Sequence, residues 1–328
     1  MHRFLNKVSE HPLVQKIGMQ QLVAILVLIA IFAFFAIQSP AFRSLNTFVS
    51  ILDVSYFVGF LAIGVTFVII TGGIDLSVGT VMMCAAIIGG VLYNDHGWSI
   101  GAAMIAIILV GLGFGFINGI MVAYLKLPAF IATLGTMMVS RGIGSIISGV
   151  RSVSFPLRSH ADGWFRYIFR TSNNFPTGIL VLFGCGILAA IILNKTKLGR
   201  YIFSIGSNIE ATRLSGVNVA KYQTMAYCLS GIFAGIAGIA FAATYTTILP
   251  GSGNGTELDA IAAAVVGGTS LAGGVGSILG TFVGVYIMTV LRIGLPFIGL
   301  QPHYQILTTG LVVILAVYAD VARNRKKR

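Results

Sequence analysis

Long apolar segments alternate with short polar ones along almost the whole chain. A helix needs about 20 mostly apolar residues to cross the hydrocarbon core of a bilayer, and lipid leaves no backbone amide without an internal partner. A transmembrane barrel would instead show short segments of alternating hydrophobicity. The pattern therefore predicts an all-α, polytopic membrane protein with about ten transmembrane helices. The expected segments are 21–37, 54–71, 78–93, 98–125, 128–148, 177–193, 222–247, 258–267, 276–293 and 303–320.

Two glycine-rich interruptions of these apolar segments resemble each other. Paired broken segments of this kind point to a substrate pathway between structural repeats. We therefore expect short broken helices next to both interruptions. One reads Gly72-Gly73-Ile74-Asp75-Leu76-Ser77-Val78-Gly79, and the other reads Gly267-Gly268-Thr269-Ser270-Leu271-Ala272-Gly273-Gly274.

The composition fits a surface that faces lipid. Of the 328 residues, 56% are hydrophobic and 9% are charged, whereas a soluble domain carries about 25% charged residues. The net charge is +12, but the basic residues gather at the chain ends and in loops between apolar segments. This distribution is typical of residues that set membrane topology, so we expect no nucleic-acid partner.

The basic residues also predict an orientation. We divide the chain into a cytoplasmic N-terminal segment (1–20), a transmembrane domain (21–320) with a basic loop at 194–221, and a basic cytoplasmic tail (321–328). An even number of crossings puts both ends on one side, and the positive-inside rule makes that side the cytoplasm. The loop at 149–176 then lies outside although it carries several arginines, which conflicts with the rule. We keep the count because the other basic clusters agree with it.

Glycines recur at a spacing of four residues within several apolar segments. Small residues at this spacing let helix backbones approach closely in lipid, where no hydrophobic force drives helices together. We interpret them as helix-packing positions rather than nucleotide loops, because no strand precedes them. The glycines concerned are Gly111, Gly115, Gly119, Gly231, Gly235, Gly276, Gly280 and Gly284.

The basic loop at 194–221 contains the signals of a short amphipathic helix. Ser207 or Asn208 can cap a helix that begins directly after them, and Glu210 occupies its first turn, where the helix dipole favours an acid. Gly216 is the kind of residue that commonly ends a helix. Such a helix between two spans suits docking to a cytosolic partner. Alternatively, the loop is solvated and its charges only fix the orientation.

Four strings of residues resemble the permeases of ribose, galactose and xylose importers that are driven by ATP-binding cassette (ABC) ATPases. Glu210-Ala211-Thr212 followed by Gly216 resembles the Glu-Ala-Ala…Gly signature of ABC importer permeases, with Thr212 in place of an alanine. The resemblance covers roughly residues 45–320. The other three strings are Gly72-Gly73-Ile74-Asp75-Leu76-Ser77-Val78-Gly79, Leu127-Pro128-Ala129-Phe130-Ile131-Ala132-Thr133-Leu134-Gly135-Thr136 and Glu257-Leu258-Asp259-Ala260-Ile261-Ala262.

The resemblance implies a monosaccharide importer of the bacterial inner membrane. Such a permease pairs with a second permease chain, receives a pentose or hexose from a periplasmic binding protein, and docks on a cytosolic ABC ATPase through the helix around Glu210. The sequence has no Gly-x-x-x-x-Gly-Lys-Ser/Thr loop, so we expect no cofactor in this chain, with ATP and Mg on the partner ATPase. The coupling residues that the resemblance implies are Gly199, Arg200, Asn208, Glu210, Ala211, Thr212 and Gly216.

Polar residues inside the apolar segments are candidates for the translocation pathway or its gating. A carboxylate in the membrane costs about 2.5–3.5 kcal/mol on insertion scales, so Asp75 has either a pathway role or a cap role at the next helix. Acids at the start of a short helix favour its N-terminus, while amides and hydroxyls either bond to a helix or face the pathway. The candidates are Asp75, Ser77, Asn118, Thr133, Glu257 and Asp259.

Other functions are alternatives. An ion-coupled secondary transporter usually keeps a buried ionisable relay, and no basic residue accompanies Asp75. As an ABC permease, the chain alternatively carries a nucleoside, a polyol or a branched-chain amino acid. The His-Glu-x-x-His motif of intramembrane metalloenzymes is absent from the sequence, so we predict a transport subunit and no enzyme. Cys84, Cys185 and Cys228 lie in apolar segments without metal-binding spacing, and we predict no metal site.

Overall fold

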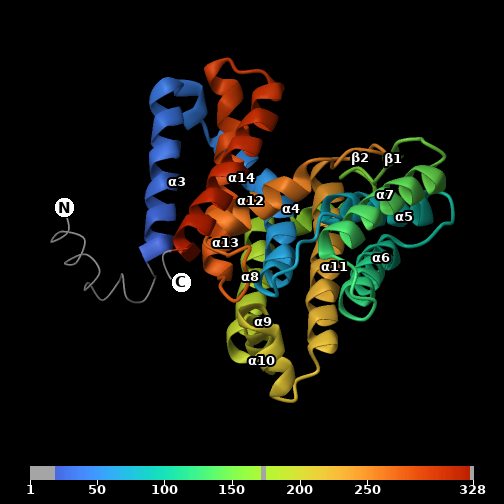
Figure 1. The fold of residues 1–328 in the computed structure, drawn as a ribbon. Helices are drawn as coiled ribbons and strands as arrows, with labels where there is room; N and C mark the ends of the chain where they lie inside the picture. Colours follow the sequence, from blue (N-terminus) through green and yellow to red (C-terminus); the bar gives the residue numbers. More distant parts are fainter. Residues whose placement is uncertain (1–18, 171–174, 326–328) are drawn as a thin grey trace.

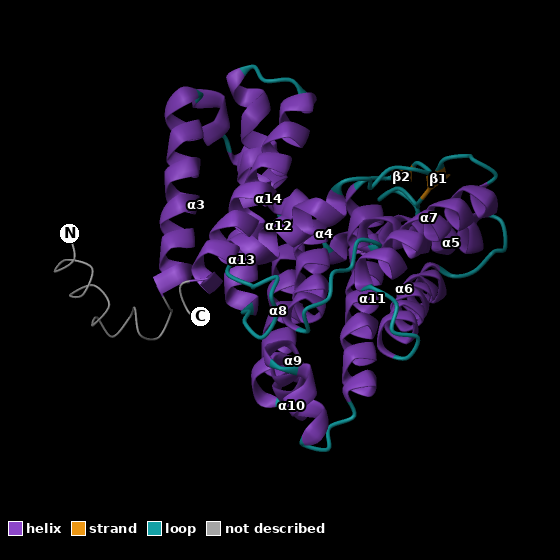
Figure 2. Cartoon of the chain, in the orientation of Figure 1, coloured by secondary structure: helices purple, strands orange, loops and turns teal. Residues whose placement is uncertain are grey.

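The structure is a computed structural model that describes residues 19–170 and 175–325. This part of the chain is a bundle of helices with one pair of two-residue strands (Figure 1; Figure 2). The strands β1 (Val153–Ser154) and β2 (Thr247–Ile248) are antiparallel. The helices are α3 (Met19–Gln38), η1 (Pro40–Arg43), α4 (Leu45–Ile70), α5 (Val78–Asn94), α6 (Ile100–Ala123), α7 (Ala129–Ser148), η2 (Ala161–Ile168), α8 (Gly178–Lys195), α9 (Lys197–Ser207), α10 (Ile209–Leu214), α11 (Val219–Thr244), α12 (Thr256–Val266), α13 (Ile278–Gly294), η3 (Leu295–Ile298) and α14 (Pro302–Arg325).

Each of the predicted apolar segments coincides with one helix, which confirms the all-α, polytopic fold. Within the described residues, eight helices are long and apolar enough to cross a membrane: α3, α4, α6, α7, α8, α11, α13 and α14. The other two predicted segments are the short helices α5 and α12, of 17 and 11 residues. These short helices adjoin the two glycine-rich interruptions, as the sequence predicts.

The ends of the chain differ in part from their prediction. The N-terminal segment at 1–20 lies outside the described residues up to position 18. The expected tail at 321–328 is not separate from the last helix, because α14 continues to Arg325. Arginine is a good helix former, so a basic stretch of sequence does not by itself end a helix.

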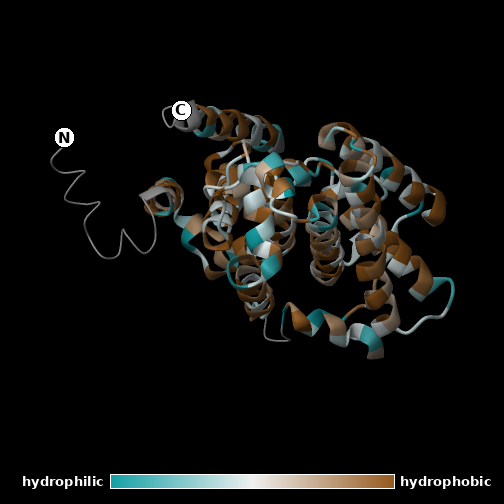
Figure 3. Ribbon diagram, turned by 60° about the horizontal axis from the view of Figure 1, so that its bottom comes forward, coloured by the Kyte–Doolittle hydropathy of each residue, from teal (hydrophilic) through white to brown (hydrophobic). Residues whose placement is uncertain are grey.

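Helix α4 forms the centre of the bundle. Helices α8, α11, α12 and α13 pack around it, and its side chains are buried from Ile51 to Ile70. A helix that is hydrophobic on all sides is stable only when other elements cover it. The outer helices α3 and α14 instead expose leucines and isoleucines, and their ribbons are largely brown in the hydropathy view (Figure 3). Lipid-facing and protein-facing helices therefore occupy different layers.

The start of α4 corrects the sequence prediction. The apolar segment predicted here starts at residue 54, but the helix already begins at Leu45. Ser44 caps it, because its hydroxyl accepts a hydrogen bond from the Thr47 amide at 3.3 Å. The polar residues of these first turns line one face of α4. For this reason the turns do not appear as part of the apolar segment in the sequence.

Helices α6 and α11 touch through glycine. A Cβ atom at Gly111 would overlap the carbonyl oxygen of Gly231, and one at Gly115 would overlap the carbonyl oxygen of Tyr227. A Cβ at Gly119 would lie 2.8 Å from the Thr224 Cα. The predicted glycine face of α6 therefore packs against α11 at backbone contact distance, as small-residue motifs in membranes do.

A second glycine contact joins α13 to α12. A Cβ atom at Gly280 would overlap the carbonyl oxygen of Gly267, and one at Gly284 would overlap that of Ala263. The expectation that Gly276 shares this helix face was wrong, because α13 begins only at Ile278. Ser277 caps α13 by accepting a hydrogen bond from the Gly280 amide, so the preceding glycine lies in the loop.

The two ends of the bundle carry different elements. Helices α9 and α10 project from the lower end in Figure 1, at the side where α3 begins and α14 ends. The β1–β2 pair, in which β1 belongs to the loop at 149–176 and β2 follows α11, lies at the opposite end. This arrangement puts the basic loop at 194–221 and the arginine-containing loop at 149–176 on opposite sides, as the count of segments predicts.

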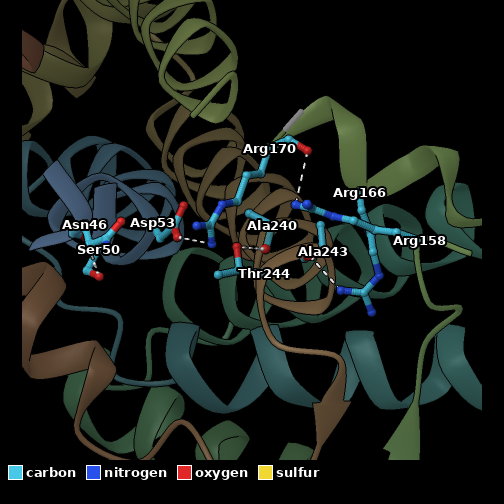
Figure 4. Close-up of polar contacts among 9 residues, drawn as sticks. All are labelled: Asn46, Ser50, Asp53, Arg158, Arg166, Arg170, Ala240, Ala243 and Thr244. Atoms are coloured by element: carbon cyan, nitrogen blue, oxygen red, sulfur yellow. Dashed lines mark hydrogen bonds and ion pairs between the residues drawn. The ribbon is translucent and has the colours of Figure 1, made fainter. Parts of the chain in front are cut away.

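The arginines of the loop at 149–176 are used inside the protein. Arg166 is buried and donates hydrogen bonds to the carbonyl oxygens of Pro156 (2.6 Å) and Ala243 (2.9 Å), and burial lowers the pKa of its guanidinium. Arg170 forms an ion pair with Asp53 at 3.1 Å (Figure 4). Two arginines of this loop therefore hold the loop against the bundle, through carbonyl oxygens and through a carboxylate.

The glycine contact between α6 and α11 generates a stability prediction. Gly111→Ala should lower the free energy of unfolding by about 1–3 kcal/mol, the usual cost of overpacking, because the new methyl group meets the backbone of Gly231. The measurement is thermal unfolding of the purified protein in detergent.

The matched control is Gly113→Ala in the same helix. No atom lies within 4 Å of a Cβ at this position, so its melting temperature should not fall. Equal melting temperatures for the two variants would contradict the packing of α6 on α11.

Candidate functional site

Helix α10 is the short capped helix that the sequence predicts in the basic loop. Asn208 is its N-cap, and the Asn208 Oδ1 atom accepts a hydrogen bond from the Ala211 amide at 2.9 Å. Gly216 follows the helix with φ = 78°, the left-handed conformation in which glycine ends helices. Local capping rules alone therefore define both ends of this helix.

The loop also contains a helix that we did not predict. Residues 197–207 form α9, which begins after Thr196 because the Thr196 hydroxyl caps the Gly199 amide. Gly199 lies against the end of α8, where a Cβ would overlap the carbonyl oxygen of Leu193. The segment at 194–221 is thus a helix–turn–helix unit that is packed on the bundle.

Thr212, the residue that departs from the Glu-Ala-Ala pattern, joins α10 to α9. Its buried side chain lies 2.8 Å from the Ser204 hydroxyl and donates to the Asn208 carbonyl at 2.7 Å. An alanine could make neither bond. The threonine therefore fixes the angle between the two helices, so that α10 moves together with α9.

The outer surface of α10 is exposed and partly apolar. Glu210 and Arg213 form an exposed ion pair at 3.0 Å, and Ala211 and Arg200 are exposed as well. Leu214 is 88% exposed, although this helix protrudes beyond the ends of the spanning helices (Figure 1). The exposed face of α10 thus offers charged groups and an apolar side chain that a partner protein could contact.

Both glycine-rich interruptions meet at the end of α9. The Gly274 amide donates a hydrogen bond to the Ile70 carbonyl at 2.8 Å, which joins the second interruption to the end of α4. A Cβ at Gly206 in α9 would overlap that same Ile70 carbonyl oxygen. A Cβ at Gly273 would come within 3.0 Å of both Gly206 and Gly72. Helix α9 is therefore in direct backbone contact with both interruptions.

The second interruption is also tied to the last helix. Asp320 in α14 accepts hydrogen bonds from the Ser270 hydroxyl at 2.9 Å and from the Leu271 amide at 3.1 Å. Asp320 lies at the end of the predicted segment 303–320, where an acid can be expected at the membrane interface. Its carboxylate instead connects α14 to the loop that contacts α9.

Asp75 lies in a hydrogen-bonded network beyond the first interruption. Its Oδ1 atom accepts from the Ser77 amide (3.0 Å) and the Ser77 hydroxyl (2.6 Å), and its Oδ2 atom accepts from the Ser230 hydroxyl of α11 (2.9 Å). Asp75 is 2% exposed. The backbone amide that it binds belongs to Ser77, the residue directly before α5. Asp75 therefore stabilises the turn that leads into α5 and does not cap the helix itself.

Asn118 and Thr136 extend this network to α6 and α7. The Thr136 hydroxyl donates to the Asn118 Oδ1 atom at 2.5 Å, and the Asn118 amide donates to the Ser77 hydroxyl at 2.9 Å. The hydrogen bonds thus form a chain from Thr136 through Asn118 and Ser77 to Asp75. Hydrogen bonds in such a chain strengthen one another where the local dielectric is low. Thr133 bonds to its own helix and reaches the Ile74 carbonyl at 3.3 Å. Asp75, Ser77, Asn118 and Thr133 therefore lie together.

Glu257 lies next to this network without joining it. The starts of the short helices α5 and α12 touch, because a Cβ at Gly79 would lie 2.6 Å from the Glu257 Oε2 atom. The Glu257 Oε1 atom accepts a hydrogen bond from the Gly255 amide at 3.0 Å, which fits the expected N-terminal role. Two half-helix N-termini thus meet inside the bundle, each with a carboxylate beside it.

Asp259 has a different role from the expected one. It forms an ion pair with Arg292 of α13 at 2.9 Å and accepts a hydrogen bond from Thr309 of α14 at 3.0 Å. The acid therefore joins α12, α13 and α14 instead of capping α12. The sequence analysis missed Arg292, whose only signal is a single basic residue near the end of an apolar segment.

Among the described residues, no group of three histidine, cysteine, aspartate or glutamate side chains is placed to hold a metal ion. The site is therefore built from hydroxyls, amides and single carboxylates. This chemistry suits the passage of a polar solute and the transmission of movement between helices.

A bundle of spanning helices with paired broken helices inside it and a capped helix that protrudes from one end is the arrangement of a transport permease. The chain belongs to the family described as "Branched-chain amino acid transport system / permease component", which matches residues 47–317. It is therefore a transport component and not an enzyme.

Several proteins of known name resemble the chain over almost its full length. The ribose import permease protein RbsC of Escherichia coli (strain K12) is 40% identical over 313 residues, which cover 94% of each chain. The galactose/methyl galactoside import permease protein MglC of Haemophilus influenzae is 34% identical, over 92% of this chain and 94% of MglC. The xylose transport system permease protein XylH of the same organism is 30% identical, over 95% of this chain and 99% of XylH. No solved structure matches the chain significantly.

The network around Asp75 generates a second stability prediction. Asn118→Leu should lower the free energy of unfolding by about 1 kcal/mol, because hydrogen bonds between membrane helices contribute about 0.6 kcal/mol each on average and Asn118 makes one to Ser77 and one to Thr136. The measurement is thermal unfolding in detergent. Asn194→Leu is the control, because this asparagine is exposed and bonds only to its own helix; an equal loss in both variants would argue against the network.

Proposed function

We propose that the chain is the membrane-spanning subunit of an ABC importer that carries a monosaccharide, either a pentose or a hexose. The observation that carries this cargo assignment is the similarity to permeases named for ribose, galactose and xylose import, at 30–40% identity over more than nine tenths of the chain. The neutral hydrogen-bonding groups around Asp75 suit a sugar, which presents hydroxyls and no charge.

In this proposal, α10 is the docking helix for a cytosolic ABC ATPase. The exposed Glu210, Arg213 and Leu214 form its contact surface, and Asn208 and Gly216 hold its ends. ATP and Mg are bound by that ATPase, since the sequence has no phosphate-binding loop of the Gly-x-x-x-x-Gly-Lys type. Closure of the ATPase pushes α10, and Thr212 passes the movement to α9.

The movement then reaches the interior through backbone contacts. Gly206 presses on the Ile70 carbonyl and on the loop at Gly274, so α9 can shift both interruptions at once. The first interruption leads to Asp75 and Ser77, and the second is held by Asp320 of α14. Because packed elements move as rigid bodies, a shift at α10 changes the relative position of α5 and α12.

The remaining partners belong to the same proposal. A periplasmic binding protein delivers the sugar at the end of the bundle that carries β1 and β2, and a second copy of this chain completes the pathway. Both chain ends and α10 lie in the cytoplasm, and the membrane is the bacterial inner membrane. The orientation rests on the basic residues at 194–221, which the positive-inside rule assigns to the cytoplasm.

A branched-chain amino acid is the second candidate cargo, because the family description names that class. An amino acid carries two charges, and the described residues around Asp75 offer no cation for its carboxylate. This difference favours the neutral cargo. An ion-coupled carrier is less consistent with the structure, because Asp75 bonds to serines and to no second ionisable group.

Charge reversal on α10 tests the coupling role. Glu210→Arg removes the ion pair with Arg213 and places two like charges on the docking surface, so ATP-driven sugar uptake should fall at least about tenfold. Gly216→Pro should have a similar effect, because proline cannot adopt the positive φ at this position. The measurement is uptake of labelled D-ribose, D-galactose and D-xylose by proteoliposomes that contain the complete transporter.

The matched control is Asp95→Arg, an exposed acid in the loop after α5. It should leave uptake near the wild-type rate, with equal amounts of inserted protein in all samples. Wild-type uptake by the Glu210→Arg variant would exclude the coupling role of α10, and no uptake of any of the three sugars by the wild type would exclude the cargo assignment.

A further inference from the structure

A cavity of about 630 Å³, lined by both apolar and polar side chains, opens at the end of the bundle opposite α10. It lies between the first turns of α4, the end of α13 with η3, and the start of α14. Sites for small molecules usually have volumes of about 300–1,000 Å³. The side chains that give the cavity its chemistry are Asn46, Ser50, Tyr245, Arg292, Phe297 and Gln305.

The cavity carries hydrogen-bonding groups that the protein does not use. Within the described part of the chain, neither the Asn46 amide nor the Gln305 amide has a side-chain partner, and the Arg292 guanidinium bonds only to Asp259. An arginine has five donors in a fixed plane, and an amide has two donors and an acceptor. Planar groups of this kind bind pairs of neighbouring hydroxyls.

The cavity is close to electrically neutral. Arg292 is its one charged lining residue, and the Asp259 carboxylate at 2.9 Å compensates that charge. Thr309 holds the same carboxylate in place at 3.0 Å. A neutral polar ligand is therefore favoured over a phosphate or a carboxylate, which would need an uncompensated cation.

An aromatic ring forms part of the wall. The Tyr245 ring packs on Phe241 with 4.6 Å between ring centroids, and on Phe57 with 6.1 Å, so its orientation is fixed. The Tyr245 and Arg292 side chains both line the cavity. Asn46, Ser50 and Asp53 follow one another along one face of α4, and Arg170 approaches this face from the loop at 149–176 (Figure 4).

We propose that this cavity is an outer binding site for one neutral monosaccharide. Asn46, Arg292 and Gln305 contact its hydroxyls, while Tyr245 presents an apolar ring face with a polar tip, as tyrosines do at interfaces. The site rests on the proposed function, because it lies at the end where an importer receives its cargo. It gives the permease a place to hold the sugar after a binding protein releases it.

The test is sugar protection of a cysteine in the cavity. Ser50→Cys, in the complete transporter in proteoliposomes, is labelled with a membrane-impermeant maleimide in the absence and presence of D-ribose, D-galactose or D-xylose. We expect at least one of these sugars to slow labelling about threefold or more. The protection should be lost when Asn46→Leu or Gln305→Leu is added.

Gln301→Cys is the matched control, because this exposed residue precedes Gln305 by one helical turn and does not line the cavity. Its labelling should be the same with and without sugar. The protein without an added cysteine gives the background from Cys84, Cys185 and Cys228.

The outcomes separate this site from the proposed function. If the wild type takes up one of the sugars but none slows labelling of Ser50→Cys, the cavity is not a sugar site although the importer assignment stands. Protection that persists in the Asn46→Leu and Gln305→Leu variants would also overturn the proposal. Protection by the anionic lipid phosphatidylglycerol in place of sugar would assign the cavity to a lipid headgroup.

Discussion

Lipid supplies neither hydrogen-bond partners for the backbone nor a hydrophobic force between helices, and this constraint shapes the whole structure. The helices associate by bringing their backbones into contact at glycines, as at Gly111 against Gly231 and at Gly284 against Ala263. Where the chain leaves helical geometry, at the two interruptions, other parts of the protein surround it and form hydrogen bonds with Asp75, Ser270 and the Gly274 amide. Broken helices are tolerated in a membrane only under this condition.

The same close backbone contacts can transmit a displacement from one helix to the next. A backbone pressed against a backbone leaves no flexible side chain to absorb a displacement, and this is the contact at Gly206, Ile70 and Gly274. The helix–turn–helix unit of α9 and α10 can therefore act as a lever on both interruptions. In the proposed coupling, the network of Asp75, Ser77 and Asn118 lies beyond this contact and receives the movement next. A permease without its own energy source needs such a rigid route from the cytosol to the pathway.

Some of this structure could be predicted from the sequence because the signals are local. The ends of α10 follow from Asn208 and Gly216, and the broken helices follow from glycine pairs inside apolar runs. The long helices could be predicted from the apolar segments, because a helix needs about 20 apolar residues to cross a bilayer. The position of Asp75 beside Ser77 follows from their spacing.

Other features depend on contacts between distant residues, and a pattern along the chain does not contain them. The pairing of Asp259 with Arg292 joins residues 33 positions apart, and Asn118 finds Ser77 across 41 positions. Helix α9 was not predicted because its polar residues are typical of a loop. The packing of Gly199 on the end of α8, which supports the helix, is visible only in the structure. The structural role of the buried Arg166 could not be predicted either, because the carbonyl groups that accept its hydrogen bonds come near only in the fold.

The central claim is that α10 faces the cytosol, where an ATPase can push it. The most direct measurement is labelling of a Leu214→Cys variant with a membrane-impermeant maleimide, because this side chain is the most exposed of α10. The account predicts rapid labelling in inside-out membrane vesicles and almost none in right-side-out spheroplasts. Labelling in spheroplasts but not in inside-out vesicles would place α10 on the outer face and contradict the account.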